Sequence, residues 1–467
     1  AILEEELKRL NADVGHYIPH RVKEGYGLNL GAVKLTHKQN ITLFIALDCG
    51  IKSFKEIESL NKHKIDVVVV DHHQPEKGRL PSAYAIIDPK REDCSYEFKG
   101  LAAVGLVYKL ICALQENNRE KYLDLVCLGT IADVMPLVDE NRIIVKRGLS
   151  SINNTTNCGI KALIDVSGLK DKDINPGRVS FILAPRINAS GRVDTAEVSL
   201  KLLMSRNYEE AKQLASRLNT HNRLRQKIEE GVFKEALNLV ECKINFKEHS
   251  IIVLAKEGWH VGVLGIVASK IAEKYFRPTI IISLKDGLGK GSGRSIPGFH
   301  LFDALLACSK HLKYFGGHSY AVGLSIEKDK VEEFTADMNN VVKERIDLDV
   351  LKPVLEIDAQ LPLIFLNHDL IGKIQDLGPF GIGNPRPVFC SHNLTIESPA
   401  AILGRDTIKF WVTDEERTYE AIGFGLKDMA PYIVPLKRID LAYSLTLDNW
   451  QDANSILLEI KDLKFVS

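Results

Sequence analysis

The sequence lacks a long apolar run, paired cysteines and a net charge. No apolar run approaches the roughly 20 residues that span a bilayer, so the sequence indicates no membrane partner. The eight cysteines are scattered and never form a CxxC pair, which argues against a zinc knuckle or a disulfide framework and favours a reducing, cytoplasmic location. The 61 basic residues balance the 61 acidic ones, so only local clusters of charge can indicate a partner.

The sequence also lacks internal repeats, low-complexity tracts and an initiator methionine. Residues 1–10 are expected to be helical, and Ala1–Leu7 looks like the middle of an amphipathic helix without a cap. We therefore expect the natural N-terminus to lie upstream of Ala1. A chain of 467 residues is too long for one hydrophobic core, so we expect about two to four domains.

The stretch Asp66–His73 combines a strand pattern with potential metal ligands. Four consecutive valines are typical of a strand buried on both faces of a parallel sheet, and they precede Asp71, His72 and His73. Ligands of such sheets bind at the carboxyl ends of the strands. The alternative is that Asp71 caps a turn and both histidines are solvated.

A second apolar run, Ile41–Leu47, ends in the same way at Asp48. A helix over 52–63 connects the two runs, and a further short strand is expected at 85–87. Because a βαβ crossover is nearly always right-handed, the two strands should be parallel and close. Asp48 and Asp71 are therefore expected at the same edge of the sheet.

Asp133 follows Ala132 in an otherwise apolar helical segment. A buried carboxylate is costly without a partner, and the partner is either a metal or a helix N-terminus. Further along, Ala184–Arg192 reads as a loop of small residues with Arg186 and Arg192, which suits phosphate binding.

A second α/β unit is expected from about residue 251. It contains a Gly-rich turn, Gly289–Ser295, and the tripeptide Gly316-Gly317-His318. Between 251 and 320 there are nine Lys or Arg and four Asp or Glu, a surplus of five positive charges that favours an anionic polymer. Backbone amides in Gly-rich turns can approach phosphate closely. The alternative is a structural hairpin with a solvated rim.

The remaining expectations concern secondary structure. A long helix over about 207–240 is expected to connect two lobes, with coiled-coil pairing left open. Its partial apolar stripe is Leu214, Leu218, Leu224, Ile228 and Val232. Other expected elements are a strand at 13–18, helices over 101–117 and 119–132, a strand at 251–254, a helix over 262–275, a strand at 279–284 and a helix from about 300. Beyond about 352, short apolar segments at 354–357, 388–390, 408–412, 421–424, 441–447 and 456–460 predict a small barrel or sandwich.

Asp48, His72 and Asp133 together would supply two carboxylates and an imidazole at one sheet edge. This ligand set suits Mn²⁺ or Mg²⁺ better than a thiolate-loving ion. Two such ions about 3.5–4 Å apart can activate water and neutralise a phosphoryl group. Asp48 is the natural bridging carboxylate.

These motifs resemble those of the DHH phosphoesterases. The resemblance lies in Ala46–Gly50, Asp71-His72-His73, Gly129–Val134 and Asn188–Arg192, and Gly291–Ser295 and Gly316–His318 look like motifs of the DHH-associated domain. Three further features narrow the resemblance to the single-strand-specific 5′-to-3′ exonucleases of bacteria. They are the long helix, the segment with Ile18, Pro19, Arg21 and Glu24–Asn29, and the turn Gly378–Gly381, which lies in the segment Leu377–Pro385 that joins the last region to the rest. The resemblance covers nearly the whole chain.

The resemblance implies an α/β fold with a parallel-sheet DHH lobe and a smaller α/β DHH-associated lobe, joined by a long helix and followed by an OB-like β-barrel. The corresponding bounds are 1–205 for the catalytic domain, 206–242 for the helix, 243–350 for the substrate-binding domain and 351–467 for the barrel. The grooves of OB folds often hold single strands.

The resemblance also assigns roles to residues. Asp48, His72 and Asp133 would bind Mn²⁺ or Mg²⁺, with two ions expected, and His73 would contact the scissile phosphate. Asp71 would orient His72, since metal-ligating histidines usually donate their other N–H to a carboxylate or carbonyl. The expected contacts to the strand are Asn188, Arg192, Ser292, Arg294, Ser295 and His318.

The implied function is metal-dependent degradation of single-stranded DNA to mononucleotides, in recombination and repair. The implied partners are single-stranded DNA, a single-strand-binding protein and a helicase, with the enzyme itself a monomer. The family's first, aspartate-rich motif would precede Ala1, so we expect residues 1–467 alone to hydrolyse DNA poorly. Two alternatives are a DHH-type phosphodiesterase for short oligonucleotides or cyclic dinucleotides, and a catalytically defective nucleic-acid-binding scaffold.

Overall fold

The structure is a computed structural model that describes residues 1–20, 24–25, 27–38, 40–115, 120–193, 195–448 and 455–466. Arg21 and Tyr26, which belong to one of the motifs above, lie outside the described residues. The chain forms two compact units. The larger unit consists of residues 1–133 and 147–353, and the smaller unit of residues 134–146 and 354–467.

The first half of the larger unit is mostly helical around a small sheet. Its elements are α1 Ile2–Arg9, α2 Leu30–Lys38, β1 Leu43–Leu47, α3 Phe54–Lys62, β2 Asp66–Val70, β3 Ala85–Ile87, α4 Ala103–Leu114, α5 Leu123–Ala132, α6 Asp139–Asn153, α7 Cys158–Val166, α8 Pro176–Arg178, the π-helix Val179–Leu183, α9 Ala184–Val193, α10 Glu197–Met204 and α11 Tyr208–Lys243. Helix α6 starts in the smaller unit and ends in the larger one.

The first sheet has the order β1-β2-β3, and its strands are parallel. The predicted parallel strand is confirmed. Its burial on both faces is nearly complete, because Val67 and Val69 on one face and Val70 on the other are fully buried, while Val68 is only partly buried. The strand expected at 13–18 is wrong, because these residues have no regular secondary structure. They are largely exposed and face no strand with which they could pair.

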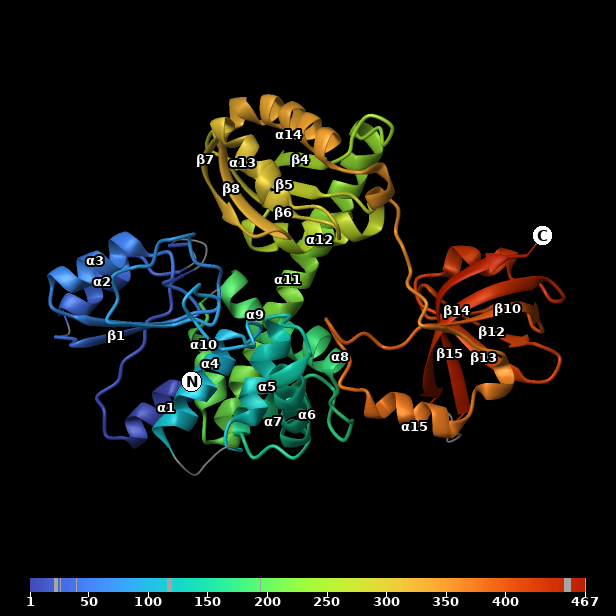
Figure 1. The fold of residues 1–467 in the computed structure, drawn as a ribbon, viewed down its shortest axis with the longest axis horizontal. Coiled ribbons are helices and arrows are strands. Elements are labelled where there is room, and N and C mark those ends of the chain that lie inside the picture. The colour runs from blue at the N-terminus through green and yellow to red at the C-terminus, as the bar shows by residue number, and fades with distance from the viewer. Residues whose placement is uncertain are drawn as a thin grey trace. The chain divides into compact units, whose positions relative to one another are not determined.

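The second half of the larger unit is a mixed sheet between helices. Its elements are β4 Ile252–Glu257, α12 Leu264–Tyr275, β5 Thr279–Lys285, β6 Leu288–Arg294, α13 Leu301–Ala307, β7 Leu312–Gly317, β8 Ala321–Glu327 and α14 Val331–Arg345, with short 3₁₀ turns at Val261–Val263, Ser309–His311, Lys328–Lys330 and Leu348–Leu351. The strand order is β4-β5-β6-β8-β7. Helices α13 and α14 cover one face and α12 the other (Figure 1).

Residues 289–294 of the Gly-rich segment belong to strand β6, so the prediction of a turn is wrong. Strand β6 lies between β5 and β8 and is antiparallel to both, and its backbone amides are used in the sheet. A Cβ at Gly293 would lie 2.6 Å from Val322 Cγ2, and one at Gly291 would lie 2.9 Å from Leu324 Cδ1. The glycines therefore make room for aliphatic side chains of the neighbouring strand, and they do not free the backbone for phosphate.

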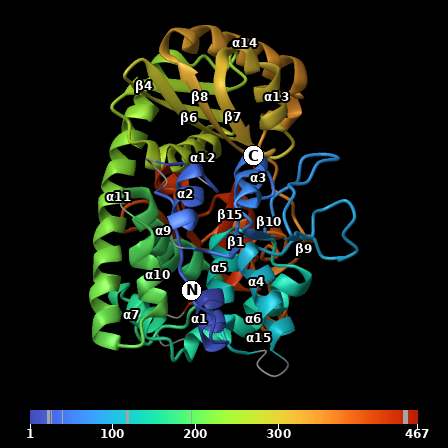
Figure 2. The same ribbon diagram turned by 90° about the vertical axis from the view of Figure 1, so that its left-hand side faces the viewer.

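Helix α11 confirms the prediction of a long connecting helix. It runs from the helices of the first half to the edge of the second sheet (Figure 2). The predicted apolar stripe is only partly right. Leu218 and Val232 are buried, whereas Leu224 is 49% exposed, and small residues such as Ala211 and Ala215 fill the contact instead.

The segment 184–192 is a helix, so the prediction of a loop is also wrong. Ala189 and Ser190 in α9 are fully buried, and the Ser190 hydroxyl donates to Ile187 O over 3.1 Å. The small residues allow α9 to pack closely against α11 and α5. No helix in the described ranges combines the length and the apolar character needed to cross a membrane.

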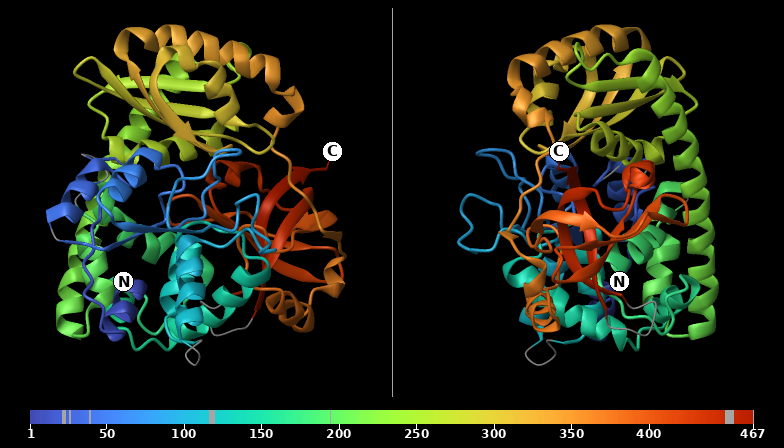
Figure 3. Two further views of the ribbon diagram at one scale, coloured as in Figure 1. Left: turned by 60° about the vertical axis from the view of Figure 1, so that its left-hand side comes forward. Right: turned by 90° about the vertical axis from the view of Figure 1, so that its right-hand side faces the viewer.

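The smaller unit is a β-barrel with flanking helices, and its strands are shown in orange and red in Figure 3. Its elements are β9 Ala359–Gln360, α15 His368–Asp376, β10 Phe389–Ile396, β11 Ala401–Leu403, β12 Thr407–Thr413, β13 Thr418–Gly423, β14 Arg438–Asp448 and β15 Ser455–Phe465, with 3₁₀ turns at Leu363–Phe365 and Lys427–Tyr432. The order β12-β13-β15-β14-β10 closes on itself through pairing of β10 with β12. The OB-like barrel is thus confirmed, but the strand expected at 354–357 is wrong, because these residues are exposed and unpaired.

The turn Leu377–Pro385 holds the segment 134–146 within the smaller unit. Leu137 N donates to Ile382 O over 2.6 Å, and Arg142 Nη2 donates to Asp376 O over 3.0 Å. The side chain of Leu137 is 3% exposed, and it lies where a Cβ on Gly381 would meet it at 2.7 Å. Residues far apart in the sequence therefore pack together in this unit.

Candidate metal centre and strand-binding residues

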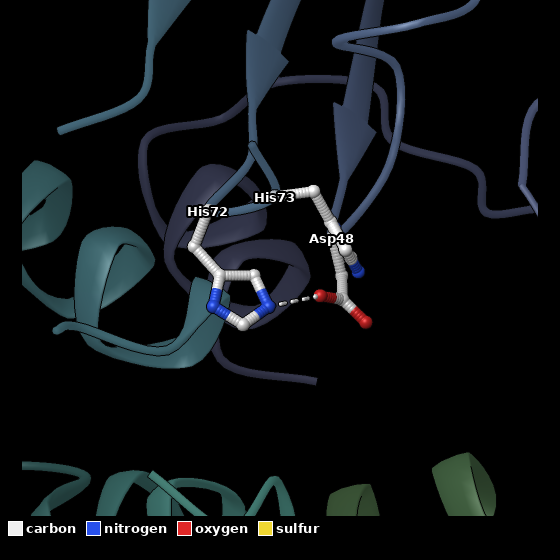
Figure 4. Close-up of side chains that lie close together, drawn as sticks. All are labelled: Asp48, His72 and His73. Carbon is white, nitrogen blue, oxygen red and sulfur yellow. Dashed lines mark ion pairs between the residues drawn. The ribbon is translucent and has the colours of Figure 1, made fainter. Parts of the chain in front are cut away.

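Three of the predicted site residues come together in the larger unit. His72 Nε2 lies 3.2 Å from Asp48 Oδ1 and 3.3 Å from Asp133 Oδ2. Figure 4 shows the His72 imidazole turned toward the Asp48 carboxylate at the ends of two strands. The three side chains come from the ends of β1, β2 and α5, as the sequence predicted.

Asp48 takes an uncommon backbone conformation at the end of β1. Its φ is +61°, in the left-handed region that few residues other than glycine adopt. Its backbone N donates to Val70 O over 3.0 Å, so the strand pairing of β1 and β2 holds this conformation in place. Such conformations persist where the surrounding structure fixes them, and they concentrate at functional sites.

Asp133 forms the C-cap of α5, and its N donates to Gly129 O over 2.9 Å. Its carboxylate faces His72 Nε2, and among the described residues it accepts no hydrogen bond from a helix N-terminus, so that alternative is wrong. Partial removal from water raises the pKa of Asp133, although its side chain is 45% exposed; the charge of His72 lowers this pKa, and the negative charge of Asp48 raises it. A positive charge between the two carboxylates would relieve this repulsion.

Asp71 contacts the ring of His73, and the prediction that it orients the ring of His72 is wrong. His73 Nδ1 lies 2.7 Å from Asp71 Oδ1, which also accepts from the backbone N of His72 and His73. Ile51 N donates to Asp71 Oδ2 over 3.1 Å. The sequence could not separate the two histidines, because the direction of each ring depends on the backbone after β2.

The Asp71–His73 pair has a consequence for charge. Burial alone would raise the pKa of Asp71, but hydrogen bonds from His73 and Ile51 outweigh it and lower the pKa. The hydrogen bond to Asp71 in turn raises the pKa of His73, against the opposing effect of burial. The pair therefore favours a positively charged imidazole beside the candidate metal centre.

The donor set fits a divalent cation. One ligand atom each from Asp48, His72 and His73 lies within 4.8 Å of the other two, and Asp133 approaches the same nitrogen of His72. Carboxylate oxygens and imidazole nitrogens suit Mn²⁺ and Mg²⁺, and the free carboxylates repel each other without a cation. The nitrogen that faces the two carboxylates is His72 Nε2, whereas His72 Nδ1 is buried without a hydrogen-bond partner among the described residues.

His318 lies beside this cluster, at the end of the second half's sheet. Its ring stacks on that of His73, with 5.6 Å between the ring centres and 17° between the planes. Burial, and then the positive charges of Lys52 and His73, lower the pKa of His318. The Gly316-Gly317-His318 motif therefore contacts the Asp71-His72-His73 motif. The order of the two motifs along the sequence could not have shown this contact.

The other predicted strand-binding residues have specific neighbours. Arg294 Nη1 donates to Gly293 O over 2.8 Å and to Ser292 Oγ over 3.2 Å, and the guanidinium packs closely on Gly265. The Ser295 hydroxyl donates to Phe299 O, so it supports the backbone. Arg192 Nη1 donates to Gly262 O over 3.0 Å, which ties α9 to the start of α12. Asn188 is exposed on α9.

The predicted basic surface between 251 and 320 is smaller than the sequence indicated. Four of its lysines form ion pairs with carboxylates outside that stretch: Lys256–Glu235, Lys270–Glu229, Lys310–Asp337 and Lys313–Glu327. These acids lie on α11, α14 and β8. A count along the sequence missed them because the fold brings them in from other elements.

Sequence reasoning missed Asp88, Lys52 and Lys90. Asp88 follows β3 as Asp48 follows β1 and Asp71 follows β2, so the apolar run followed by an acid was a signal available in the sequence. Burial raises the pKa of Asp88 to about 6, opposed by a hydrogen bond from Lys90 N. The charges of Lys52 and Lys90 both act on His318, which places these lysines around the same centre.

Three family models match this chain. They are the DHH family N-terminal domain over residues 1–130, the DHHA1 domain over 248–344 and the RecJ OB domain over 357–462. The Bacillus subtilis single-stranded-DNA-specific exonuclease RecJ is 36% identical over 99% of this chain, which spans 59% of that relative. The Escherichia coli protein of the same name is 34% identical over 97% of this chain and 82% of its own length.

Solved structures agree with these matches. The crystal structure of RecJ from Thermus thermophilus in complex with Mn²⁺ superposes with a TM-score of 0.85 at 29% identity, over 100% of this chain and 66% of that one. A structure of RecJ from the same organism in complex with Mg²⁺ has a TM-score of 0.73 at 27% identity, over 91% of this chain and 62% of that one. With the DHH, DHHA1 and OB models in order along one sequence, the chain belongs to the RecJ family.

Proposed function

We propose that the protein is a metal-dependent exonuclease that degrades single-stranded DNA from the 5′ end to mononucleotides, in recombination and repair. The observation that carries the proposal is the convergence of Asp48, His72 and Asp133, with 3.2 and 3.3 Å from His72 Nε2 to the two carboxylates. Membership of a family whose named relatives are single-stranded-DNA-specific exonucleases supports the substrate.

Asp48, His72 and Asp133 would hold Mn²⁺ or Mg²⁺, the ions present in the two RecJ crystal structures. Bound there, divalent cations supply a Lewis acid for the phosphoryl oxygens and lower the pKa of water. In the hydrolysis, a water oxygen bonds to phosphorus, the P–O bond to the next nucleotide breaks, and the leaving oxygen takes up a proton.

His73 and His318 would bind the phosphate that reacts. Asp71 favours the charged form of His73, so the imidazolium can donate Nε2–H to a phosphate oxygen. His318 stacks on His73 and presents a second imidazole at the same place. We propose Arg294, Ser292, Arg192 and Asn188 as further contacts to the strand, with Ser295 supporting the loop that follows β6.

We further propose the domain bounds 1–205, 206–242, 243–350 and 351–467, supported by the position of each sheet within one of them. Single-strand-binding protein and a helicase as partners, and a monomeric enzyme, are proposals that rest on the family alone. The rival substrates are short oligonucleotides and cyclic dinucleotides. The closed barrel of the smaller unit favours the longer strand, because OB folds hold several nucleotides.

The proposal is tested by Asp48→Ala and Asp133→Ala in the full-length protein. Both should abolish release of nucleotides from single-stranded DNA in Mn²⁺ and leave strand affinity within a few-fold, because they remove ligands for the cation and not contacts to the polymer. Asp66→Ala, an exposed acid at the other end of β2, is the matched control. Full turnover by either variant, or equal loss of strand affinity and turnover, would contradict the assignment.

A further inference from the structure

Two buried polar atoms beside the candidate metal centre have no hydrogen-bond partner among the described residues. They are His72 Nδ1 and Asp88 Oδ2, in residues that are 7% and 3% exposed. Their strands are neighbours, since β2 pairs with β3 and Asp71 N donates to Ile87 O over 3.0 Å. Buried polar groups are nearly always hydrogen-bonded, so both atoms require an explanation.

A bound cation would change which ring nitrogen of His72 carries the hydrogen and therefore needs an acceptor. Without one, a hydrogen on Nε2 can lie between the carboxylates of Asp48 and Asp133, which are 3.2 and 3.3 Å away. An imidazole that ligates a cation through Nε2 carries its hydrogen on Nδ1. In His72 that nitrogen is buried away from water, so this hydrogen needs an acceptor from the protein.

We propose that Asp88 is a positioning residue that accepts the Nδ1–H of His72 when a divalent cation is bound. The inference rests on the metal-dependent function proposed above. Asp88 Oδ1 is occupied by Lys90 N at 2.8 Å, and Oδ2 remains available. Asp88 directly follows β3 and His72 lies two residues beyond β2, so the parallel pairing of these strands brings both residues to the same edge of the sheet.

The pairing would fix the tautomer and the direction of the His72 ring. Carboxylates in this position raise the basicity of a ligating histidine, and their loss typically costs 10–100-fold in metal affinity. Asp71 cannot take this role, because its Oδ1 already contacts the ring and backbone of His73 and its Oδ2 accepts from Ile51 N. The competing explanation is that Asp88 only closes the turn to Lys90.

Calorimetric titration of Mn²⁺ into the full-length protein separates the two explanations. Asp88→Asn keeps an oxygen for Lys90 N and so keeps the turn, but it has no second acceptor for His72. We expect Asp88→Ala to bind Mn²⁺ roughly 10- to 100-fold more weakly than the native protein, with Asp88→Asn near the lower end. Glu92→Gln removes an exposed charge from the same loop and should change nothing.

A second readout does not depend on affinity. In protein labelled with ¹⁵N at histidine, Mg²⁺ should produce an exchange-protected Nδ1 proton on His72, assigned by its loss in His72→Gln, and this proton should be missing in Asp88→Asn. Native affinity and a retained proton in Asp88→Asn would overturn the inference while leaving the metal site in place. Failure of the native protein to bind Mn²⁺ would instead refute the proposed function.

Discussion

Asp71 shows how much one buried carboxylate holds together. It is 1% exposed, and it accepts hydrogen bonds from the backbone N of Ile51, His72 and His73 and from the His73 ring. These bonds join the loops after β1 and β2. The acid of the DHH motif is therefore explained by loop geometry, and it need not touch a cation.

Replacing this carboxylate with an amide should be costly. In Asp71→Asn the NH₂ group would face either Ile51 N or the backbone N of His72 and His73, and two donors cannot bond. We expect a loss of about 2–4 kcal/mol in the free energy of unfolding, measured by urea denaturation. Asp66→Asn, an exposed acid at the start of the same strand, should cost less than about 0.5 kcal/mol. Equal stabilities for the two variants would contradict this account of Asp71.

At the scale of elements, the glycines of β6 are explained by the side chains of the neighbouring strands, which leave no space for a Cβ. Gly293→Ala would place a Cβ 2.6 Å from Val322 Cγ2 and 3.1 Å from Ile280 Cγ1, between two fully or nearly fully buried side chains. We expect a loss of about 1–3 kcal/mol in stability, seen as a lower melting temperature. A methyl group on Gly323 of β8 would have no atom within 4 Å, so Gly323→Ala should be neutral or slightly stabilising. Equal melting temperatures for the Gly293→Ala and Gly323→Ala proteins would refute the claim that a methyl group is crowded at Gly293.

Which elements the sequence could predict depends on what decides them. The strands β1, β2 and β3 could be predicted from their short continuous apolar runs, although only β2 is largely buried, and both ends of β1 are exposed. The segments 184–192 and 289–295 were misread as loops, because their small residues match turn composition. Their conformation is decided by close packing against α11 and β8, which come from distant parts of the sequence.

The candidate site divides in the same way. Asp48, His72 and Asp133 could be predicted because each ends an apolar element, and parallel strands share an edge. The partner of Asp71 could not be predicted, since two adjacent histidines leave a strand in different directions. The ion pairs that reduce the basic surface of the second half also depend on tertiary contacts, as Lys270–Glu229 shows.

Helix α1 is attached to the larger unit through a buried acid whose pKa gives the helix a pH dependence. Burial alone would raise the pKa of Glu6, but hydrogen bonds from Lys121, Tyr122 and Arg9 outweigh it and lower the pKa to about 2. Because the folded-state pKa lies below the usual value of 4.5, ionised Glu6 stabilises the fold. This contribution is complete above pH 4.5 and is lost as the pH falls toward 2.

Melting temperatures between about pH 6 and pH 3 test this contribution. Glu6→Gln should be destabilised at the upper end of this range and should lose less stability than the native protein on acidification. Glu5→Gln, which changes the adjacent and more exposed carboxylate, should follow the native curve. A Glu6→Gln curve parallel to the native one would show that Glu6 does not titrate in the way described.

At the scale of the whole molecule, the smaller unit is built from two separate parts of the chain. Residues 134–146 belong to it, and the buried side chain of Leu137 packs on Gly381 of the turn Leu377–Pro385. A chain ended at Pro353 would expose Leu137, so we expect increased binding of a hydrophobic dye and a lower melting temperature. Leu137→Ser should reduce dye binding in the shortened chain, yet destabilise the complete one. The same direction of change in both would refute the packing of Leu137 described here.

The shared core also limits how the family's parts can be exchanged. A barrel taken from a relative and joined after Pro353 would meet a segment 134–146 that was selected to fit a different turn from Leu377–Pro385. Chimeras of these proteins should therefore tolerate exchange only when both pieces move as a pair. Val134, the first residue of the segment that must be exchanged with the barrel, directly follows Asp133. An exchange of the barrel therefore changes the chain immediately beside a candidate metal ligand.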